Sequence, residues 1–235
     1  MNPLGHTIII IMKNKVKFFV RKLLRNNGYK IVRYETLPYS KRILSLYETF
    51  DFLTKVILKN SIDGQFVECG YGYGRSFTVL SHFSTRMNRK IYGFDSFSGF
   101  PKIVELDRSI RNPIKGEWAV RTLKEAKDTV KGLGLFNDDK DYELIELVFD
   151  EKTKNPIPKE KICLLHIDLD LFDGYKNALE IFWDQISPGG IILFDEYNEP
   201  NWPGATFAVN QFLESKNISR DEIQKINNKY YLTKA

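Results

Sequence analysis

Gln65-Phe-Val-Glu-Cys-Gly-Tyr-Gly-Tyr-Gly-Arg-Ser-Phe77 is the stretch that decides the fold of this chain. Its apolar run ends in an acid, Glu68, and three glycines follow at every second position from Gly70 to Gly74. Ser76 then begins a segment whose apolar residues recur at helical spacing. Glycines allow a sharp bend and a close approach of a ligand, and a helix start offers unpaired N–H groups. The stretch therefore predicts a strand, a glycine turn and a helix that cradle a nucleotide-like cofactor.

The composition is that of one α/β domain with a small extension. The chain has 235 residues, of which 43% are hydrophobic and 28% charged. We predict a basic amphipathic arm and a helix over residues 1–60, followed by one catalytic or binding domain over residues 61–235. The two cysteines, Cys69 and Cys163, stand in apolar runs and are expected as buried hydrophobes, which indicates a reducing, cytoplasmic location.

The net charge of +5 belongs to the arm. Residues 1–34 hold eight Lys or Arg and no acid, and the rest of the chain carries 27 basic and 30 acidic residues. A nucleic-acid partner is therefore not expected for the domain. Apolar residues at helical spacing between Val16 and Leu24 predict a helix that packs on the core or on a partner subunit, with peripheral membrane contact through residues 13–25 as the alternative. We expect a homodimer.

Helices and buried strands alternate along the domain. This order predicts a mostly parallel sheet, since parallel strands need crossover connections. The expected strands are 66–67, 90–95, 144–149, 161–170 and 191–197, the expected helices are 42–59, 123–135 and 175–186, with one more after Ser76, and 187–190 is expected as a turn. Residues 222–226 and 230–233 flank Asn227-Asn228 and predict an antiparallel hairpin that closes one edge of the sheet.

Acidic residues stand at the ends of these strands, where parallel sheets bind ligands. They are Glu68, Asp95, Asp150, Glu151, Asp168, Asp170, Asp195 and Glu196. Asp95 follows the glycines by 20 to 25 residues, the place of an acid that binds ribose hydroxyls. The glycine turn alone fits nicotinamide cofactors, other nucleotides and S-adenosylmethionine, and Asp95 strengthens the nucleotide interpretation.

Four of these acids are expected at one rim. Asp168 and Asp170 lie two residues apart, and Asp195 and Glu196 end the following strand. Like charges this close repel one another unless a cation lies between them. Carboxylate oxygens suit a hard ion such as Mg²⁺, Ca²⁺ or Mn²⁺ rather than zinc. The alternative is a set of solvated acids at loop starts. We expect His166 to be a core histidine.

Several stretches together resemble the macrocin O-methyltransferase (TylF-type) family of Rossmann-like, S-adenosylmethionine-dependent enzymes. The similar stretches are Glu68–Ser76, Gly93–Pro101, His166–Phe172, Gly189–Tyr197 and Trp202–Ala205 with Ala208, Val209 and Phe212. The resemblance spans residues 64 to 215 and implies a seven-stranded sheet, mostly parallel, with an antiparallel C-terminal strand. Two positions depart from the family pattern, because Glu196 stands where the family usually has aspartate and Asn198 where it often has glycine. The stretch 147–153 also lacks a usual glycine.

The resemblance implies a role for each matching residue. Asp168, Asp195 and Glu196 are expected to bind a divalent ion, usually magnesium, and Asp170 to act as the general base. The expected contacts of S-adenosylmethionine are Glu68, Gly70, Tyr71, Ser76, Asp95, Ser96, Asp150 and Asp168. Tyr197 and Trp202 follow the metal strand and are expected either to stack on an acceptor ring or to pack in the core or a lid. Apart from the resemblance, the polar composition of residues 102–117 predicts a mobile flap over the site.

The expected function is methylation of a hydroxyl on a sugar or a glycosylated small molecule, with S-adenosylmethionine as the donor. A nicotinamide-dependent oxidoreductase is the first alternative, disfavoured by the terminal hairpin, the acid cluster and the want of a convincing Tyr/Lys pair. The second alternative is a non-catalytic module that binds a nucleotide or a metal and docks through its basic arm.

Overall fold

The computed structural model describes residues 36–136 and 140–235. From Arg42 to Ala235 the chain forms one compact unit. The predicted arm over residues 1–34, with its helix, its membrane contact and its part in a dimer, lies outside the described residues. Helix α2, Thr36–Lys59, leads into the sheet and carries the predicted 42–59 segment.

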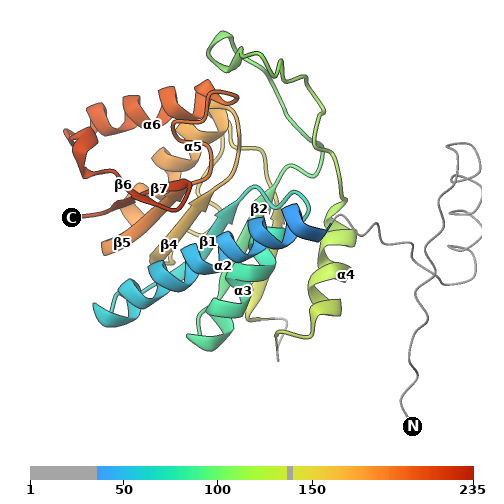
Figure 1. The fold of residues 1–235 in the computed structure, drawn as a ribbon, viewed down its shortest axis with the longest axis vertical. Coiled ribbons are helices and arrows are strands. Elements are labelled where there is room, and N and C mark those ends of the chain that lie inside the picture. Colours follow the sequence, from blue (N-terminus) through green and yellow to red (C-terminus); the bar gives the residue numbers. More distant parts are fainter. Residues whose placement is uncertain (1–35, 137–139) are drawn as a thin grey trace, which may run out of the picture. The chain divides into compact units, whose positions relative to one another are not determined.

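The centre of the unit is a seven-stranded sheet with the strand order β3-β2-β1-β4-β5-β7-β6 (Figure 1). The first five strands pair in parallel, whereas β7 runs antiparallel to both β5 and β6. The strands are β1 Gln65–Cys69, β2 Ile91–Asp95, β3 Tyr142–Glu146, β4 Ile162–Ile167, β5 Ile186–Phe194, β6 Gln224–Ile226 and β7 Lys229–Thr233. The predicted architecture and the hairpin at Asn227-Asn228 are confirmed.

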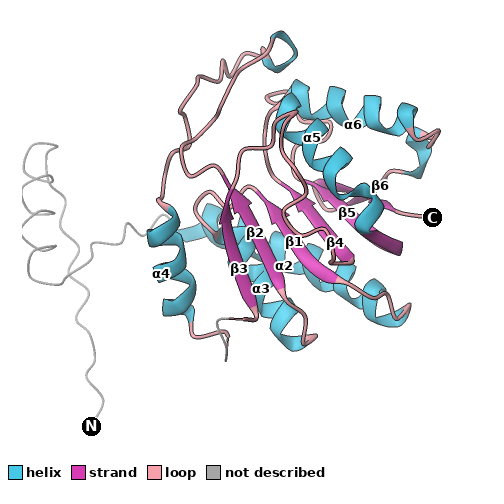
Figure 2. Ribbon diagram, turned by 180° about the vertical axis from the view of Figure 1, so that it is seen from behind, coloured by secondary structure: helices cyan, strands magenta, loops and turns pink. Residues whose placement is uncertain are grey.

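Helices cover both faces of this sheet. The remaining helices are α3 Arg75–Arg86, α4 Leu123–Leu133, α5 Phe172–Phe182 and α6 Pro203–Ser215, with short 3₁₀ turns at Glu105–Asp107, Trp183–Gln185 and Arg220–Glu222. Helices α2 and α3 lie in front of the sheet in Figure 1 and behind it in Figure 2. Successive strand residues face opposite layers: Phe66 packs in the cluster that includes α2, α3 and α4, and Val67 in the one that includes α5 and α6. Burial on both faces explains the continuous apolar runs.

Some predicted boundaries were wrong. The third strand is Tyr142–Glu146 rather than 144–149, so Asp150 and Glu151 do not end it. The apolar residues that extended the prediction leave the ladder, and Phe149, only 4% exposed, packs in the core from a loop. Strand β4 ends at Ile167, before the acids. Residues 187–190 belong to β5, where the pairing register shifts, and are not a separate turn.

Within residues 36–136 and 140–235, the helices are all too short or too polar to span a bilayer.

Candidate active site

The glycine turn connects β1 to α3. Gly70 has a φ of +99°, and a Cβ there would lie 1.7 Å from the Asp168 carbonyl oxygen, so only glycine fits between the turn and the end of β4. Gly74, with a φ of +75°, precedes the first residue of α3, and Ser76 lies buried in the first turn of that helix. A Cβ on Gly72 would meet open space. The turn thus brings its backbone against the residue that follows β4, Asp168. Its amides at Gly70 and Gly74 donate to the carbonyls of Phe94 and Tyr71, at 2.7 and 2.6 Å.

Asp95, at the end of β2, braces this turn. One of its carboxylate oxygens accepts a hydrogen bond from the Gly72 amide at 2.9 Å, and the other accepts from the Phe97 amide at 2.7 Å. The Ser96 hydroxyl donates to the Gly99 carbonyl at 2.9 Å. Asp95 and Ser96 therefore lie against the turn, where the sequence predicted cofactor contacts.

Two other predicted cofactor residues have different surroundings. The Tyr71 ring is 2% exposed and packs against Phe77 and Phe97 in the core, so its backbone is the part that borders the turn. Burial raises the pKa of Tyr71 to about 12. Asp150 stands in an exposed turn past β3, where its carboxylate accepts hydrogen bonds from the Lys152 amide and the Thr153 hydroxyl. The Asp150 side chain thus accepts hydrogen bonds within its own turn, residues 150–153.

Glu68 and His166 meet inside the sheet. They are direct neighbours in the pairing of β1 with β4, both are fully buried, and Glu68 Oε1 lies 2.9 Å from His166 Nδ1. His166 Nε2 points to the next strand, 3.6 Å from Asp195 Oδ1. Burial alone would lower the pKa of His166, but the carboxylates of Asp195 and Glu68 on either side of the ring raise it to about 10. The pair connects β1, which leads into the glycine turn, to the acid cluster. The sequence did not predict this connection.

The predicted acids converge. Asp168 and Asp195 directly follow the neighbouring strands β4 and β5. One ligand oxygen from each of Asp168, Asp170 and Glu196 lies within 4.8 Å of the others, and the same holds for ligand atoms of His166, Asp168 and Asp195. The backbone of Asp170 has a left-handed φ of +61°, which marks the turn between β4 and α5.

This crowding changes the acidity of the cluster. Burial and the charge of Asp195 raise the pKa of Asp168 to about 7. Burial and the neighbouring carboxylates also raise the pKa of Asp170 and of Glu196 well above the usual range. The pKa of Asp195 is lowered, because the adjacent His166 and the charge of Lys229 outweigh its burial. The cluster holds more carboxylates than its own cations balance.

Lys229 is one of those cations, and sequence analysis missed it. Its Nζ lies 2.5 Å from Asp195 Oδ1 and donates to the Asp195 carbonyl at 3.0 Å. Lys229 starts β7, which pairs with β5 so that Phe194 faces Tyr230. The one available signal was the register of the hairpin, since it places residue 229 beside residue 195.

Tyr175 on α5 contacts Glu196, the residue that stands where aspartate was expected. The Tyr175 hydroxyl oxygen is 2.6 Å from Glu196 Oε2 and 2.7 Å from the Ile167 carbonyl. The same oxygen accepts from the amides of Asp195 and Glu196, each at 3.1 Å. Glu196 is 4% exposed. Its longer side chain therefore reaches into the interior and still contributes an oxygen to the cluster.

These residues fit a hard divalent cation. The donors of Asp168, Asp170 and Glu196 are carboxylate oxygens, which Mg²⁺ and Ca²⁺ prefer. A cation among them would lower the pKa values that crowding raises. Asp195, beside Asp168, is the fourth available donor, although Lys229 already binds it.

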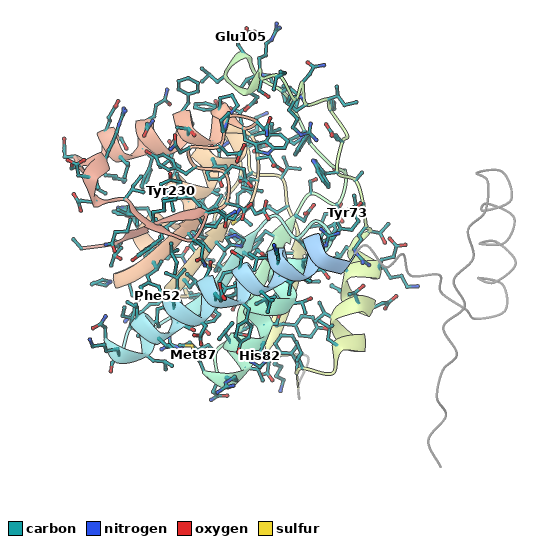
Figure 3. The ribbon with its side chains drawn as sticks, viewed as in Figure 1. Phe52, Tyr73, His82, Met87, Glu105 and Tyr230 are labelled. Atoms are coloured by element: carbon teal, nitrogen blue, oxygen red, sulfur yellow. The ribbon has the colours of Figure 1, made fainter. Side chains whose placement is uncertain are left out.

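The two predicted substrate residues both precede helix α6 and have different surroundings. Tyr197 packs in the core: its hydroxyl is 3.0 Å from Asn210 Oδ1, and its ring contacts Tyr230 at 5.3 Å between centroids. Trp202 contacts the long loop over residues 96–122, with the Phe100 ring 5.7 Å away and the Arg111 guanidinium 4.3 Å from its ring centre. Figure 3 shows Glu105 on this 96–122 loop and Tyr73 in the glycine turn.

Known proteins with similar sequences are O-methyltransferases. The family model of macrocin O-methyltransferase (TylF) matches residues 37–232. Mycinamicin III 3''-O-methyltransferase of Micromonospora griseorubida is 24% identical over 206 residues, 82% of this chain and 77% of that protein. A tetracenomycin 4'-O-methyltransferase of Streptomyces olivaceus, whose full name specifies an 8-demethyl-8-(2,3-dimethoxy-alpha-L-rhamnosyl) substrate, is 25% identical over 164 residues, 66% of this chain and 60% of that protein.

Solved structures share the fold. The calicheamicin methyltransferase CalS11 superimposes with a TM-score of 0.71 at 21% identity, covering 99% of both chains. The O-methyltransferase NovP gives a TM-score of 0.69 at 18% identity, covering 81% of this chain and 80% of its own.

Proposed function

The chain belongs to the macrocin O-methyltransferase (TylF) family, and from this premise we propose that it methylates a sugar hydroxyl with the help of a divalent cation. Membership makes the chain an O-methyltransferase that uses S-adenosylmethionine. It decides against both alternatives, the nicotinamide-dependent oxidoreductase and the non-catalytic module. The cation and the sugar are the parts that this proposal adds.

The contact between the glycine turn and the acid cluster carries the proposal. The Asp168 amide donates to the Cys69 carbonyl at 2.8 Å, and the Asp168 carbonyl leaves no room for a Cβ on Gly70. A cofactor bound at the turn and an acceptor bound at the acids would therefore lie side by side. Such juxtaposition supplies about 7 to 11 kcal/mol toward a bimolecular reaction.

The residues divide the work as follows. The turn around Gly72, with Asp95 and Ser96, holds S-adenosylmethionine. Asp168, Asp195 and Glu196 would hold the cation, which when bound would orient the acceptor oxygens and lower the pKa of the hydroxyl. Asp170 accepts the proton of that hydroxyl as its oxygen bonds to the methyl carbon and the carbon–sulfur bond breaks, leaving S-adenosylhomocysteine. General-base catalysis of this kind typically contributes about 10² to 10⁴-fold.

The acceptor class is proposed from the relatives. The name of the tetracenomycin enzyme places its substrate among rhamnosyl compounds, and a structure of CalS11 is titled as a TDP-rhamnose 3'-O-methyltransferase. Adjacent hydroxyls on a sugar suit binding by two oxygens to one cation. We propose a deoxysugar, free as a nucleotide sugar or attached to a small molecule, as the acceptor.

Two measurements test the proposal. Calorimetric titration with S-adenosylhomocysteine, with and without Mg²⁺, is expected to show binding in both conditions, because the glycine turn and Asp95 do not require the ion. Turnover with TDP-rhamnose and simple rhamnosides, followed as methylated product by mass spectrometry, is expected to stop in EDTA and return with Mg²⁺. Full turnover in EDTA would remove the cation from the proposal, and failure to bind S-adenosylhomocysteine would contradict the assigned cofactor site.

A further inference from the structure

Asp107 is a buried acid outside the cluster. It lies in the 3₁₀ turn Glu105–Asp107 of the 96–122 loop and is 2% exposed. Its Oδ1 accepts a hydrogen bond from the Phe172 amide at 2.7 Å, and its Oδ2 accepts from the Val104 amide at 3.0 Å. Burial raises its pKa, whereas these backbone hydrogen bonds lower it. Both carboxylate oxygens therefore accept hydrogen bonds from backbone amides.

One of these two hydrogen bonds, the one from the Phe172 amide, holds the start of α5. Phe172 is the first residue of that helix, and the residue at the capping position is Leu171, whose side chain carries no oxygen. An acceptor for the first amides of a helix normally comes from the capping residue itself. Here Asp107 supplies it from a loop 65 positions earlier in the chain. The negative charge also lies at the favourable end of the helix dipole.

Asp170 stands immediately before this cap. Its backbone has a φ of +61°, a conformation that is strained for an L-residue. The Leu171 amide closes the turn around Asp170 by donating to the Leu169 carbonyl at 2.6 Å. This turn is held on one side by the Asp168 amide, which donates to the Cys69 carbonyl at 2.8 Å, and on the other by the Phe172 amide, which donates to Asp107. The Asp107 bond thus fixes the C-terminal side of the segment from which the Asp170 side chain projects.

Helix α6 is shaped around the same carboxylate. A Cβ on Gly204 would lie 2.0 Å from Asp107 Oδ1 and 2.9 Å from the Phe172 nitrogen. The loop is also joined to the residues before α6 by the Ser109 hydroxyl, which donates to the Asn201 carbonyl at 2.8 Å, and by Arg111 over Trp202. Because Gly204 has no side chain, it leaves room for the hydrogen bond between the Phe172 amide and Asp107.

We propose that Asp107 is a positioning residue for methyl transfer. It joins the 96–122 loop to the first turn of α5 and thereby fixes the backbone that carries Asp170. The inference rests on the proposed function in one respect, since it takes Asp170 as the base. It adds that the 96–122 loop and the backbone of Asp170 are coupled, so that a change in the position of one displaces the other.

The first test measures backbone protection without turnover. Hydrogen exchange followed by mass spectrometry would compare the wild-type protein with Asp107→Asn, which keeps one acceptor oxygen, with Asp107→Ala, which keeps none, and with Gly204→Ala. Exchange over residues 170–174 is expected to accelerate about tenfold or more in Asp107→Ala and less in Asp107→Asn, because the Phe172 amide loses its partner. Exchange in residues 102–108 should accelerate in parallel.

Thr122→Ala is the matched control. Thr122 caps helix α4 in the ordinary way, by accepting a hydrogen bond from the Glu125 amide at 3.2 Å, so its loss removes a helix cap at the other end of the loop from Asp107. It is expected to change exchange at the start of α4 and to leave residues 170–174 unchanged. If Asp107→Ala does not fold, Asp107→Asn and Gly204→Ala carry the same comparison.

The second test separates positioning from stability. With an acceptor found in the turnover screen, Asp107→Asn is expected to lower kcat about tenfold or more, while acceptor KM and S-adenosylhomocysteine affinity stay within about threefold of wild type. A purely structural role would instead lower the fraction of chains that bind S-adenosylhomocysteine. Unchanged exchange at 170–174, or unchanged kcat, would overturn the proposal. Failure of the wild-type protein to bind S-adenosylhomocysteine would overturn the proposed function and leave the exchange result valid.

Discussion

Lys229 and Asp195 form an ion pair in which each side chain is 12% exposed and Nζ lies 2.5 Å from Oδ1. The pair joins β7 to the end of β5, so the terminal hairpin contributes a positive charge to the acid cluster. Together with His166, Lys229 lowers the pKa of Asp195 and keeps that carboxylate ionised. The cluster therefore contains one strongly acidic carboxylate, Asp195, beside others with raised pKa values.

Removal of Lys229 is expected to destabilise the protein strongly. Lys229→Met leaves Asp195 without its closest cation, and loss of one partner of a buried pair costs about 3 to 5 kcal/mol. Lys55→Met is the control, because Lys55 pairs with Asp51 on the surface of α2 at 72% side-chain exposure and its loss should cost under about 0.5 kcal/mol. Urea unfolding measures both. Added Mg²⁺ should restore part of the loss in Lys229→Met alone, and equal small losses would contradict the assigned burial of the pair.

Gly72 offers a way to separate the fold from the cofactor site. A Cβ at Gly72 or at Gly134 would meet open space, and both residues have positive φ, +47° and +61°. Alanine at either position should therefore cost about 1 to 2 kcal/mol of unfolding free energy for the same conformational reason. Only Gly72→Ala is expected to weaken S-adenosylhomocysteine binding, by about tenfold or more, because a methyl group there enters the space above the turn. Calorimetry would reveal the difference, and equal affinities would place the cofactor elsewhere.

Asp170→Asn is expected to lose turnover by about 10² to 10⁴-fold, since an amide cannot accept the acceptor's proton. Affinity for S-adenosylhomocysteine should stay close to wild type, because the proposed cofactor contacts lie in the turn after β1 and at the end of β2. Asp173→Asn makes the same chemical change in the first turn of α5 and should retain turnover within about threefold, losing only a helix-dipole interaction. Single-turnover kinetics with saturating cofactor would measure the chemical step, and full activity of Asp170→Asn would remove this residue from the mechanism.

The raised pKa of Asp168 predicts a pH-dependent contribution to stability. In the folded protein this carboxyl titrates near 7, against an ordinary value of 3.8. Between these pH values the folded state binds more protons than the unfolded state, so stability falls as pH rises through the window. The stability difference between wild type and Asp168→Asn, measured without divalent ions, should therefore decline from about pH 4 to about pH 7. Mg²⁺ should flatten this decline, and a rise with pH would show that the pKa of Asp168 is lowered instead.

The features that follow from local pattern could be predicted from the sequence. Glycine spacing and helical periodicity identify the turn between β1 and α3, and apolar runs ending in acids identify β4 and β5 together with Asp168 and Asp195. Asn227-Asn228 identifies the hairpin. The edge strand β3 was placed too late, because Leu147 and Phe149 are apolar for reasons of loop burial rather than of strand pairing.

Contacts between distant segments were beyond sequence analysis. Glu68 meets His166 only because β1 and β4 pair in one particular register. Lys229 reaches Asp195 because β7 lies beside β5, and a one-residue slip would turn its side chain to the other face. Asp107 stands in a polar loop with no periodicity, so nothing local distinguishes it from the other acids near it.

The strand that carries Lys229 is made after the six other strands of the sheet, yet it lies between two of them. A growing chain therefore contains all the carboxylates of the cluster before the lysine that balances Asp195 has been synthesised. Until the hairpin pairs with β5, the edge of that strand is open and the rim carries its largest excess of negative charge. Chains truncated before residue 229 would therefore leave Asp195 without its closest cation and the edge of β5 unpaired.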